Sequence, residues 1–391
     1  MVEGVGLMEP MLPAAGERGL EDMAMELAKK GSALAGGMHP LLRRSIGDLV
    51  RSMNCYYSNL IEGHNTHPRD IDAALRDDFS AEPEKRNLQL EAKAHIEVQR
   101  MIDHGLAPEG VTSAGFFKWV HFEFCSRLPD ELLWVENPDT GARLPVIPGQ
   151  ARTCEVAVGR HVPPLAAGLE RFMARFGEAY DPENLSQLRQ VIAIAASHHR
   201  FAWIHPFLDG NGRVGRLFSH AYFRHTGIGS SLWSISRGFA RNVEAYKAAL
   251  ENADSPRRGD MDGRGSLSEQ ALLEFCEFFL KTCLDQVDFM TRLLSMEELL
   301  SRMEIHVKEE IAAKRLPKGA FALLREAVYA GEFRRGRAEE ITGYQERQAR
   351  DVLGQLVKRE YLVSDSARGP VRLGFPLDAA ARWLPRLYPV D

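Results

Sequence analysis

The stretch His205-Pro-Phe-Leu-Asp-Gly-Asn-Gly-Arg-Val-Gly-Arg216 joins the apolar end of one predicted helix to the start of the next. Its central Gly210-Asn-Gly212 turn lets backbone N–H groups approach a ligand closely, because glycine adopts conformations that other residues avoid. The helix that follows adds unpaired N–H groups and the positive end of its dipole. The stretch therefore predicts an anion site at a helix N-terminus.

Charged side chains surround this turn. Arg213 and Arg216 are three residues apart, so they point from one side of the helix toward the same anion. Asp209 precedes the turn, where a carboxylate is suited to hold Mg²⁺ against phosphates. His205 lies four residues further upstream and is suited to take a proton from a hydroxyl. Each residue alone has an ordinary structural explanation, but the combination predicts phosphoryl or nucleotidyl transfer.

The segment resembles the signature of the Fic family, His-x-Phe-x-Asp/Glu-Gly-Asn-Gly-Arg-x-x-Arg, and matches it at every defined position. The resemblance extends from about residue 40 to about residue 300. It implies an all-helical core and the transfer of AMP from ATP to a hydroxyl of a target protein. The metal that it implies is Mg²⁺, and Mn²⁺ suits the same oxygen ligands.

The resemblance also assigns a role to each position of the motif. His205 would be the base that deprotonates a target Ser, Thr or Tyr. Phe207 would anchor the loop in the core, and Asp209 would hold Mg²⁺ between the α- and β-phosphates. The remaining residues would bind the phosphates: Gly210, Asn211, Gly212, Arg213 and Arg216.

Two other regions resemble parts of the same family. Residues 129–164 are interrupted by Pro and Gly and alternate loosely over 154–162, which predicts a short hairpin. It resembles the family's flap, which would hold the target segment as an added strand. Tyr246 would lie on the adenine side, although the Tyr-Tyr pair of many relatives is Tyr246-Lys247 here. The flap residues would be Ala151, Arg152, Thr153, Cys154, Glu155 and Val156.

A second motif lies upstream, at the end of an amphipathic helix predicted over residues 41–61. The segment Ser58-Asn-Leu-Ile-Glu62-Gly63 resembles the family's inhibitory motif, Ser/Thr-x-x-x-Glu-Gly/Asn. It implies that Glu62 pairs with Arg216, takes the place of the γ-phosphate and keeps basal activity low. The alternative is an ordinary helix end that Gly63 terminates.

The pattern changes after a basic, Pro-containing turn at residues 314–318. Helices and a hairpin then follow in the order of a winged helix-turn-helix. Basic residues on the third helix and the hairpin are interleaved with acidic ones, so DNA binding, homodimerisation and target docking are all open. The predicted helices span residues 321–330, 337–341 and 345–359, and the strands span 361–363 and 371–373.

Length and composition indicate a multidomain protein in a reducing compartment. The chain has 391 residues, more than a single hydrophobic core usually supports, and a net charge of -5. Its five cysteines are scattered, with no pattern of a zinc site or a disulfide framework. No secretion signal or membrane-spanning apolar stretch is evident, so we expect a cytoplasmic protein without a membrane partner.

Together, these patterns predict a mainly α protein: a Fic-type helical bundle with a β-hairpin flap and a small winged-helix-like domain. We expect a self-inhibited protein adenylyltransferase that acts on a target protein or on itself. The alternatives are a DNA-binding regulator that senses nucleotide and a Fic enzyme that mainly removes AMP. The predicted regions are a flexible arm (1–19), an N-terminal helical region with the inhibitory helix (20–112), the catalytic core (113–303) and the winged-helix-like domain (317–391).

Overall fold

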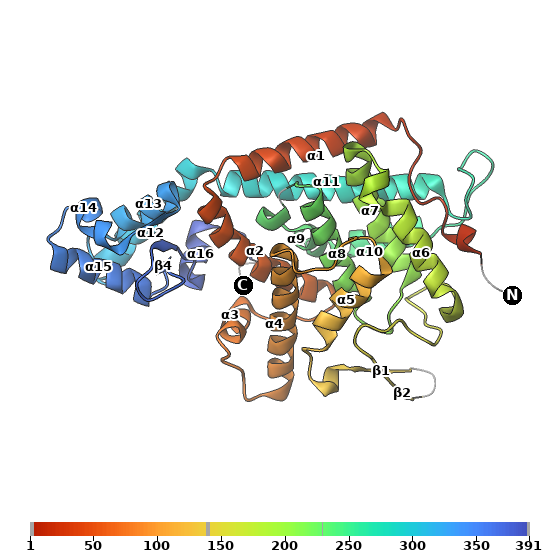
Figure 1. Cartoon of the computed structure of the whole chain (residues 1–391), viewed down its shortest axis with the longest axis horizontal. Helices are drawn as coiled ribbons and strands as arrows, with labels where there is room; N and C mark the ends of the chain where they lie inside the picture. Colours follow the sequence, from red (N-terminus) through yellow and green to blue (C-terminus); the bar gives the residue numbers. More distant parts are fainter. Residues whose placement is uncertain (1–3, 138–140, 229, 389–391) are drawn as a thin grey trace. The chain divides into compact units, whose positions relative to one another are not determined.

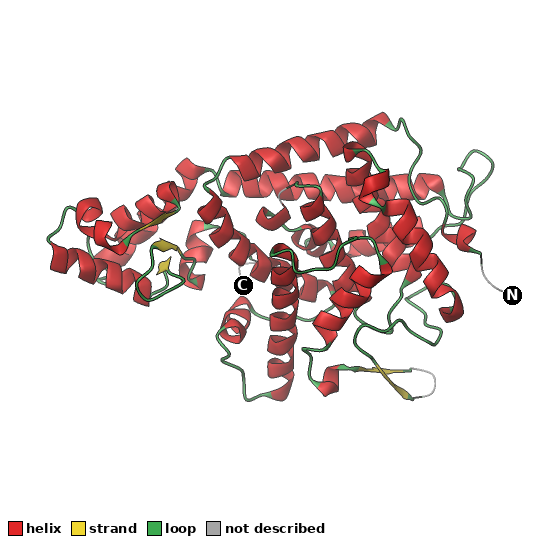
Figure 2. Cartoon of the chain, viewed as in Figure 1, coloured by secondary structure: helices red, strands yellow, loops and turns green. Residues whose placement is uncertain are grey.

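The computed structural model describes residues 4–137, 141–228 and 230–388, and most of them are helical (Figure 1, Figure 2). Contacts divide the chain into two units. The first comprises Met1–Ser32 and Asn54–Gln286, and the second comprises Ala33–Met53 and Val287–Asp391. The mainly α fold that the sequence predicts is confirmed.

Helices form nearly all of the first unit, and β1 (Trp134–Glu136) pairs antiparallel with β2 (Arg143–Pro145). Three helices have residues in both units: α1 (Arg18–Gly36), α2 (Pro40–Ile61) and α11 (Glu269–Leu293). The helices within the first unit are α3 (Pro68–Leu75), α4 (Pro83–Asp103), α5 (Ala114–Cys125), α6 (Leu169–Tyr180), α7 (Gln187–Ile204), α8 (Asn211–His225), α9 (Ile235–Ala240) and α10 (Val243–Ala253).

A cluster of aromatic rings joins the four helices that support the 205–216 motif. Phe117 of α5 stacks on Phe201 of α7, with ring centroids 4.7 Å apart, and its edge meets Phe218 of α8 at 4.9 Å. Phe176 of α6 completes the cluster at 5.3 Å from Phe117. Because such pairs have preferred geometries and all four rings are buried, they fix the end of α7 against the start of α8.

The segment predicted as a flexible arm is instead packed over residues 8–13. Met8 and Met11 are buried, the hydroxyl of Tyr180 donates to the Met11 carbonyl at 2.5 Å, and Arg200 donates to the Pro10 carbonyl at 2.8 Å. The prediction was wrong because side chains of α6 and α7 hold this segment, although its own sequence has no periodicity.

A hairpin lies within residues 129–164 as predicted, but its strands precede the loosely alternating part over 154–162. The paired strands are β1 and β2, whereas described residues 151–162 contain only an isolated bridge between Val158 and His161. Arg152 holds this segment instead, donating to the carbonyls of Cys154 at 2.9 Å and Pro164 at 2.6 Å. Side-chain hydrogen bonds thus replace the strand ladder that the loose alternation suggested. Residues 138–140 of the predicted region lie outside the described residues.

The second unit contains the predicted helices and hairpin in the predicted order, with one additional strand, β3, and one additional helix after the hairpin, α16. Its three-stranded sheet has the order β3-β5-β4, and β3 is only two residues long, too short to leave a sequence pattern. The winged-helix assignment stays an interpretation of this order. The elements are α12 (Met296–Ala312), α13 (Ala320–Ala330), β3 (Glu332–Phe333), α14 (Ala338–Thr342), α15 (Glu346–Lys358), β4 (Leu362–Val363), β5 (Val371–Leu373) and α16 (Leu377–Trp383).

Trp383 lies at the centre of the second unit. It is fully buried, and its indole Nε1 donates to His306 Nδ1 of α12 at 3.0 Å. Tyr361 and Phe375 pack their rings near it, so the end of the chain's last described helix closes this core. None of the helices in the described residues combines the length and apolar composition that crossing a membrane requires.

Candidate active site

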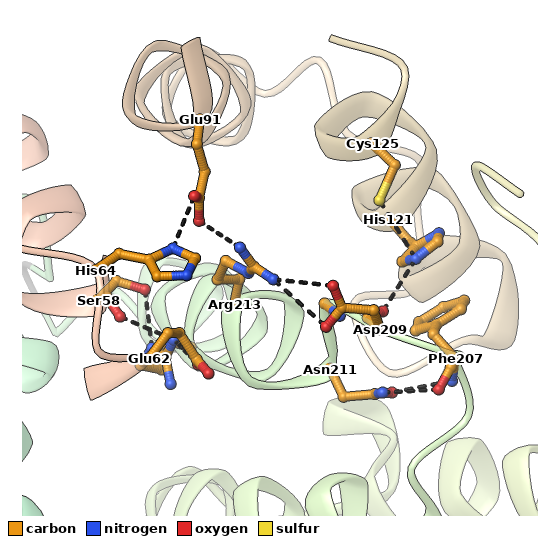
Figure 3. A network of polar contacts seen from close by, with 12 residues as sticks. Ser58, Glu62, His64, Glu91, His121, Cys125, Phe207, Asp209, Asn211 and Arg213 are labelled. Atoms are coloured by element: carbon orange, nitrogen blue, oxygen red, sulfur yellow. Dashed lines mark hydrogen bonds and ion pairs between the residues drawn. The ribbon is translucent and has the colours of Figure 1, made fainter. Parts of the chain in front are cut away.

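The motif forms a loop between α7, which ends at Ile204, and α8, which begins at Asn211. His205 and Gly210 both have left-handed backbone conformations, with φ of 48° and 79°. The side-chain amide of Asn211 closes the loop: it accepts from the Phe207 N–H at 2.9 Å and donates to the Phe207 carbonyl at 2.8 Å (Figure 3). Asn211, predicted to bind phosphate, thus shapes the loop that exposes the N–H groups of α8.

A cleft of about 720 Å³ opens beside this loop. Its volume lies in the range of small-molecule sites. The structure therefore places the candidate base, part of the anion turn, one motif arginine and the glutamate of the predicted inhibitory motif around one cavity. The lining residues relevant here are Glu62, His198, His205, Asn211, Gly212, Arg216 and Tyr246.

His205 has the protonation state that a general base needs. Burial lowers its pKa to about 4, so the imidazole is neutral near pH 7 and is able to accept a proton. Its backbone is held by Arg152, which donates through Nε to the His205 carbonyl at 2.9 Å and through its backbone N–H to the Pro206 carbonyl at 2.9 Å. The residue that supports the flap segment thus also supports the base.

The segment predicted to be inhibitory contacts Arg216. Arg216 donates to the Glu62 carboxylate at 2.5 Å, to the Ser58 hydroxyl at 2.9 Å and to the Ser58 carbonyl at 3.1 Å. Burial alone would raise the pKa of Glu62, but attraction to Arg216 and Arg213 lowers it, so the carboxylate is charged. A side chain at Gly212 would collide with this carboxylate. The motif glycine therefore makes room for the glutamate, and Gly63 ends the segment with φ of 86°.

Asp209 and Arg213 line a separate cavity of about 60 Å³. The Asp209 side chain is half exposed, and its oxygens lie 3.4 and 3.5 Å from Arg213. Mg²⁺ is often bound by one or two carboxylates together with substrate phosphates and water, and a half-exposed Asp209 fits that role. The described residues contain no group of three or more potential metal ligands, so phosphates would have to supply further oxygens.

Tyr246 lines the main cleft and is held rigidly. Its hydroxyl lies 2.8 Å from His198 Nε2, and its ring stacks on Phe239 with centroids 4.1 Å apart. Burial raises the pKa of Tyr246 to about 12, so the hydroxyl keeps its proton. The neighbouring Lys247 lines the same cleft, and the assignment of Tyr246 to the adenine side stays a prediction.

The six predicted flap residues, all of them described, lie outside the lining of the cleft. The residues that line it from this segment are Val158, Gly159, Arg160 and His161. His161 Nε2 donates to the Trp203 carbonyl at 2.7 Å, and its Nδ1 lies 3.6 Å from an Asp254 carboxylate oxygen. The end of the segment, rather than its start, thus borders the candidate nucleotide site.

Sequence reasoning missed His121 of α5, which contacts Phe207 and Asp209 of the motif (Figure 3). Its Nδ1 accepts from the Gly149 N–H at 2.8 Å, so Nε2 carries the proton and donates to the Asp209 carbonyl at 3.3 Å. The ring stacks on Phe207 with centroids 4.0 Å apart, and burial lowers its pKa to about 4. The available signal was a histidine on a mostly apolar helix.

His95 of α4 is a buried histidine whose protonation the fold opposes. Its side chain is fully buried, and neither ring nitrogen has a hydrogen-bond partner among the described residues. Burial, with Arg216 and Arg213 nearby, lowers its pKa to about 3. An unfolded histidine binds a proton at about pH 6.5, so unfolding takes up a proton below that pH. Stability therefore falls as the pH drops from 7 toward 3.

The unfolding free energy of wild type is expected to fall between about pH 7 and about pH 5. In the His95→Leu variant this fall is expected to be smaller by about 2 kcal/mol, because unfolding no longer takes up a proton at residue 95. Denaturant unfolding at both pH values measures the difference. His104→Asn, at an exposed position, is the control. Equal losses in wild type and His95→Leu would contradict a neutral His95 in the folded protein.

Comparison with known proteins places the site in a family. The Fic/DOC family model matches residues 118–223, which include the whole motif. A protein adenylyltransferase Fic from Nematostella vectensis is 31% identical over 180 residues, covering 44% of this chain and 37% of that protein. The corresponding protein from Drosophila erecta is 37% identical over 83 residues, covering 21% of this chain and 17% of that protein. The matches thus span well under half of these relatives' lengths.

Solved structures show the same fold. A Fic family protein from Desulfovibrio desulfuricans G20 has a TM-score of 0.51 at 19% identity, covering 90% of this chain and 95% of that chain. A structure of Fic-1 (aa134 - 508) from C. elegans has a TM-score of 0.51 at 15% identity, covering 71% of this chain and 73% of that one. Residues 118–223, which include the motif, thus match the Fic/DOC family, and the chain's fold resembles that of solved Fic family proteins.

Proposed function

We propose that this protein is an adenylyltransferase that moves AMP from ATP to a Ser, Thr or Tyr hydroxyl of a target protein. The observation that carries the proposal is the convergence of His205, the Asn211–Gly212 part of the turn and Arg216 on one cleft at the start of α8. The relatives from Nematostella vectensis and Drosophila erecta, which are called protein adenylyltransferase Fic, support it.

The proposed reaction is an in-line substitution at the α-phosphorus. The target hydroxyl oxygen forms a bond to Pα, the bond from Pα to the bridging oxygen breaks, and pyrophosphate leaves. His205 takes the hydroxyl proton, while the N–H groups at the start of α8 stabilise the charge that builds on the phosphate oxygens. Asp209 would hold Mg²⁺, which would neutralise charge on the phosphates. The motif arginines orient the outer phosphates.

Glu62 restrains this reaction in the proposal. Its carboxylate pairs with Arg216, so the γ-phosphate loses its cation and ATP binds in a pose unsuited to in-line attack. Ser58 reinforces the pair by accepting two further hydrogen bonds from the same guanidinium. The protein is therefore a low-activity form that becomes active when the end of α2 moves away from the cleft.

The test uses the Glu62→Gly variant with ATP labelled at the α- or the γ-phosphate, with Mg²⁺ or Mn²⁺, alone and with a cell lysate. Label from the α-position on protein, with none from the γ-position, supports AMP transfer. Label from the γ-position instead indicates phosphoryl transfer. If neither label appears while the folded variant still binds ATP, the proposal fails and a nucleotide-sensing regulator becomes the better explanation. DNA binding and dimerisation by the second unit stay predictions.

A further inference from the structure

Glu91 of α4 is a buried carboxylate that connects the motif to the inhibitory segment. Its side chain is 1% exposed, and it accepts from Arg213 and pairs with His64 Nδ1 at 2.8 Å. Burial alone would raise the pKa of Glu91, but the bonds to His64 and Arg213 lower it, so the group is an anion. Figure 3 shows Glu91 pointing from its helix to both partners.

Arg213 is held firmly on one side and loosely on the other. Its NH1 donates to Glu91, and its guanidinium lies over the Phe124 ring at 5.2 Å. On the other side its NH2 lies 3.4–3.5 Å from Asp209, and its Nε has no hydrogen-bond partner among the described residues. The side toward Asp209, the candidate metal ligand, is thus the side with donors to offer to a phosphate.

The pair of Glu91 and Arg213 is expected to persist when nucleotide binds. Both side chains are buried, at 1% and 10% exposure, so separating them would leave an uncompensated charge in the interior. The loose contact to Asp209 costs far less to replace. Glu91 therefore supports Arg213 in the nucleotide-bound state and does not compete with phosphate for it.

His64 brings the inhibitory segment to the same carboxylate. It lies two residues after Glu62, and its hydrogen bond to Glu91 raises its pKa. The segment is therefore linked to both motif arginines. Glu62 pairs with Arg216 directly, whereas His64 and Arg213 are linked because each pairs with Glu91. When Glu62 leaves the cleft, the bond between His64 and Glu91 is expected to break with it.

We propose that Glu91 is a positioning residue that holds Arg213 for the outer phosphates of ATP and, through His64, anchors the inhibitory segment. The proposal rests on the proposed AMP transfer and its restraint by Glu62. The two roles are separable, because removing His64 leaves the bond between Glu91 and Arg213 intact, whereas removing the charge of Glu91 affects both.

The experiment places Glu91→Gln and His64→Ala in the wild-type and Glu62→Gly backgrounds. In the Glu62→Gly background, Glu91→Gln is expected to raise the Kd of a non-hydrolysable ATP analogue and the KM for ATP about tenfold, with kcat within about threefold, because Arg213 loses a charged partner. Isothermal titration calorimetry gives the Kd without requiring activity. Glu97→Gln, on the same helix with Arg127 as its partner, is the matched control.

His64→Ala tests the anchor. It is expected to raise AMP transfer about tenfold when Glu62 is present and to change it less than about twofold when Glu62 is Gly, since no inhibitory carboxylate then remains for His64 to hold in place. An unchanged analogue Kd in Glu91→Gln, or equal effects of His64→Ala in both backgrounds, would overturn the proposal. His64 is partly exposed, so its variant tests the anchor even if Glu91→Gln does not fold. A Glu62→Gly protein that transfers no AMP refutes the proposed function instead, and the calorimetry still tests the role of Glu91 toward Arg213.

Discussion

Replacing Glu62 by Gly is expected to raise the rate of AMP transfer about 100- to 1,000-fold. Arg216 is 2% exposed and Glu62 is 32% exposed, so their ion pair is largely shielded from water. Losing one partner of a buried pair typically costs about 3–5 kcal/mol, and partial exposure of Glu62 reduces this to about 3–4 kcal/mol. A change of about 1.4 kcal/mol is a factor of ten, which gives the range. The freed guanidinium then binds the γ-phosphate.

Initial rates with ATP labelled at the α-phosphate measure this effect on wild type and Glu62→Gly under identical conditions. Glu109→Gly is the matched control, because it makes the same substitution at an exposed loop residue before α5. Its rate is expected to equal that of wild type. If Glu62→Gly transfers no faster than wild type although both bind an ATP analogue, the pair with Arg216 is structural and does not restrain the reaction.

The local part of the site was predictable because short stretches of sequence determine it. The loop from His205 to Asn211 is closed by bonds within itself, and Glu62 lies at the end of a helix whose amphipathic pattern is clear. Glu91 and His121 were not predictable, because they lie 122 and 88 residues from their motif partners Arg213 and Asp209. Only the packing of α4 and α5 against α8 brings them to the motif.

In the fold, segments with apolar periodicity were predicted well and irregular segments were not. Apolar periodicity predicted a helix over residues 41–61, close to the observed α2 (Pro40–Ile61), and one over 345–359, close to α15 (Glu346–Lys358). Irregular segments were mispredicted where distant polar side chains hold them. Tyr180 and Arg200 bind the N-terminal segment, and Arg152 holds the flap segment to the motif loop. No repeating pattern encodes such contacts.

Replacing His205 by Ala in the Glu62→Gly background is expected to lower AMP transfer about 1,000-fold, within the range of about 100- to 10,000-fold for loss of a general base. The expectation depends on His205 being neutral, and its pKa of about 4 makes it so at pH 7. For the same reason the rate of the Glu62→Gly protein is expected to stay level as the pH is lowered from about 7 to about 5.5.

Single-turnover rates with labelled ATP measure the loss, and calorimetry with a non-hydrolysable ATP analogue measures binding in the same proteins. The turn, Arg216 and Asp209 remain in His205→Ala, so the analogue Kd is expected to stay within about threefold while transfer falls. His104→Ala is the control at an exposed histidine. A parallel loss of binding would show that the ring of His205 supports the loop. Retained transfer would mean that a group other than His205 takes the proton. The hydrogen bonds from Arg152 would then hold the loop without positioning a catalytic base.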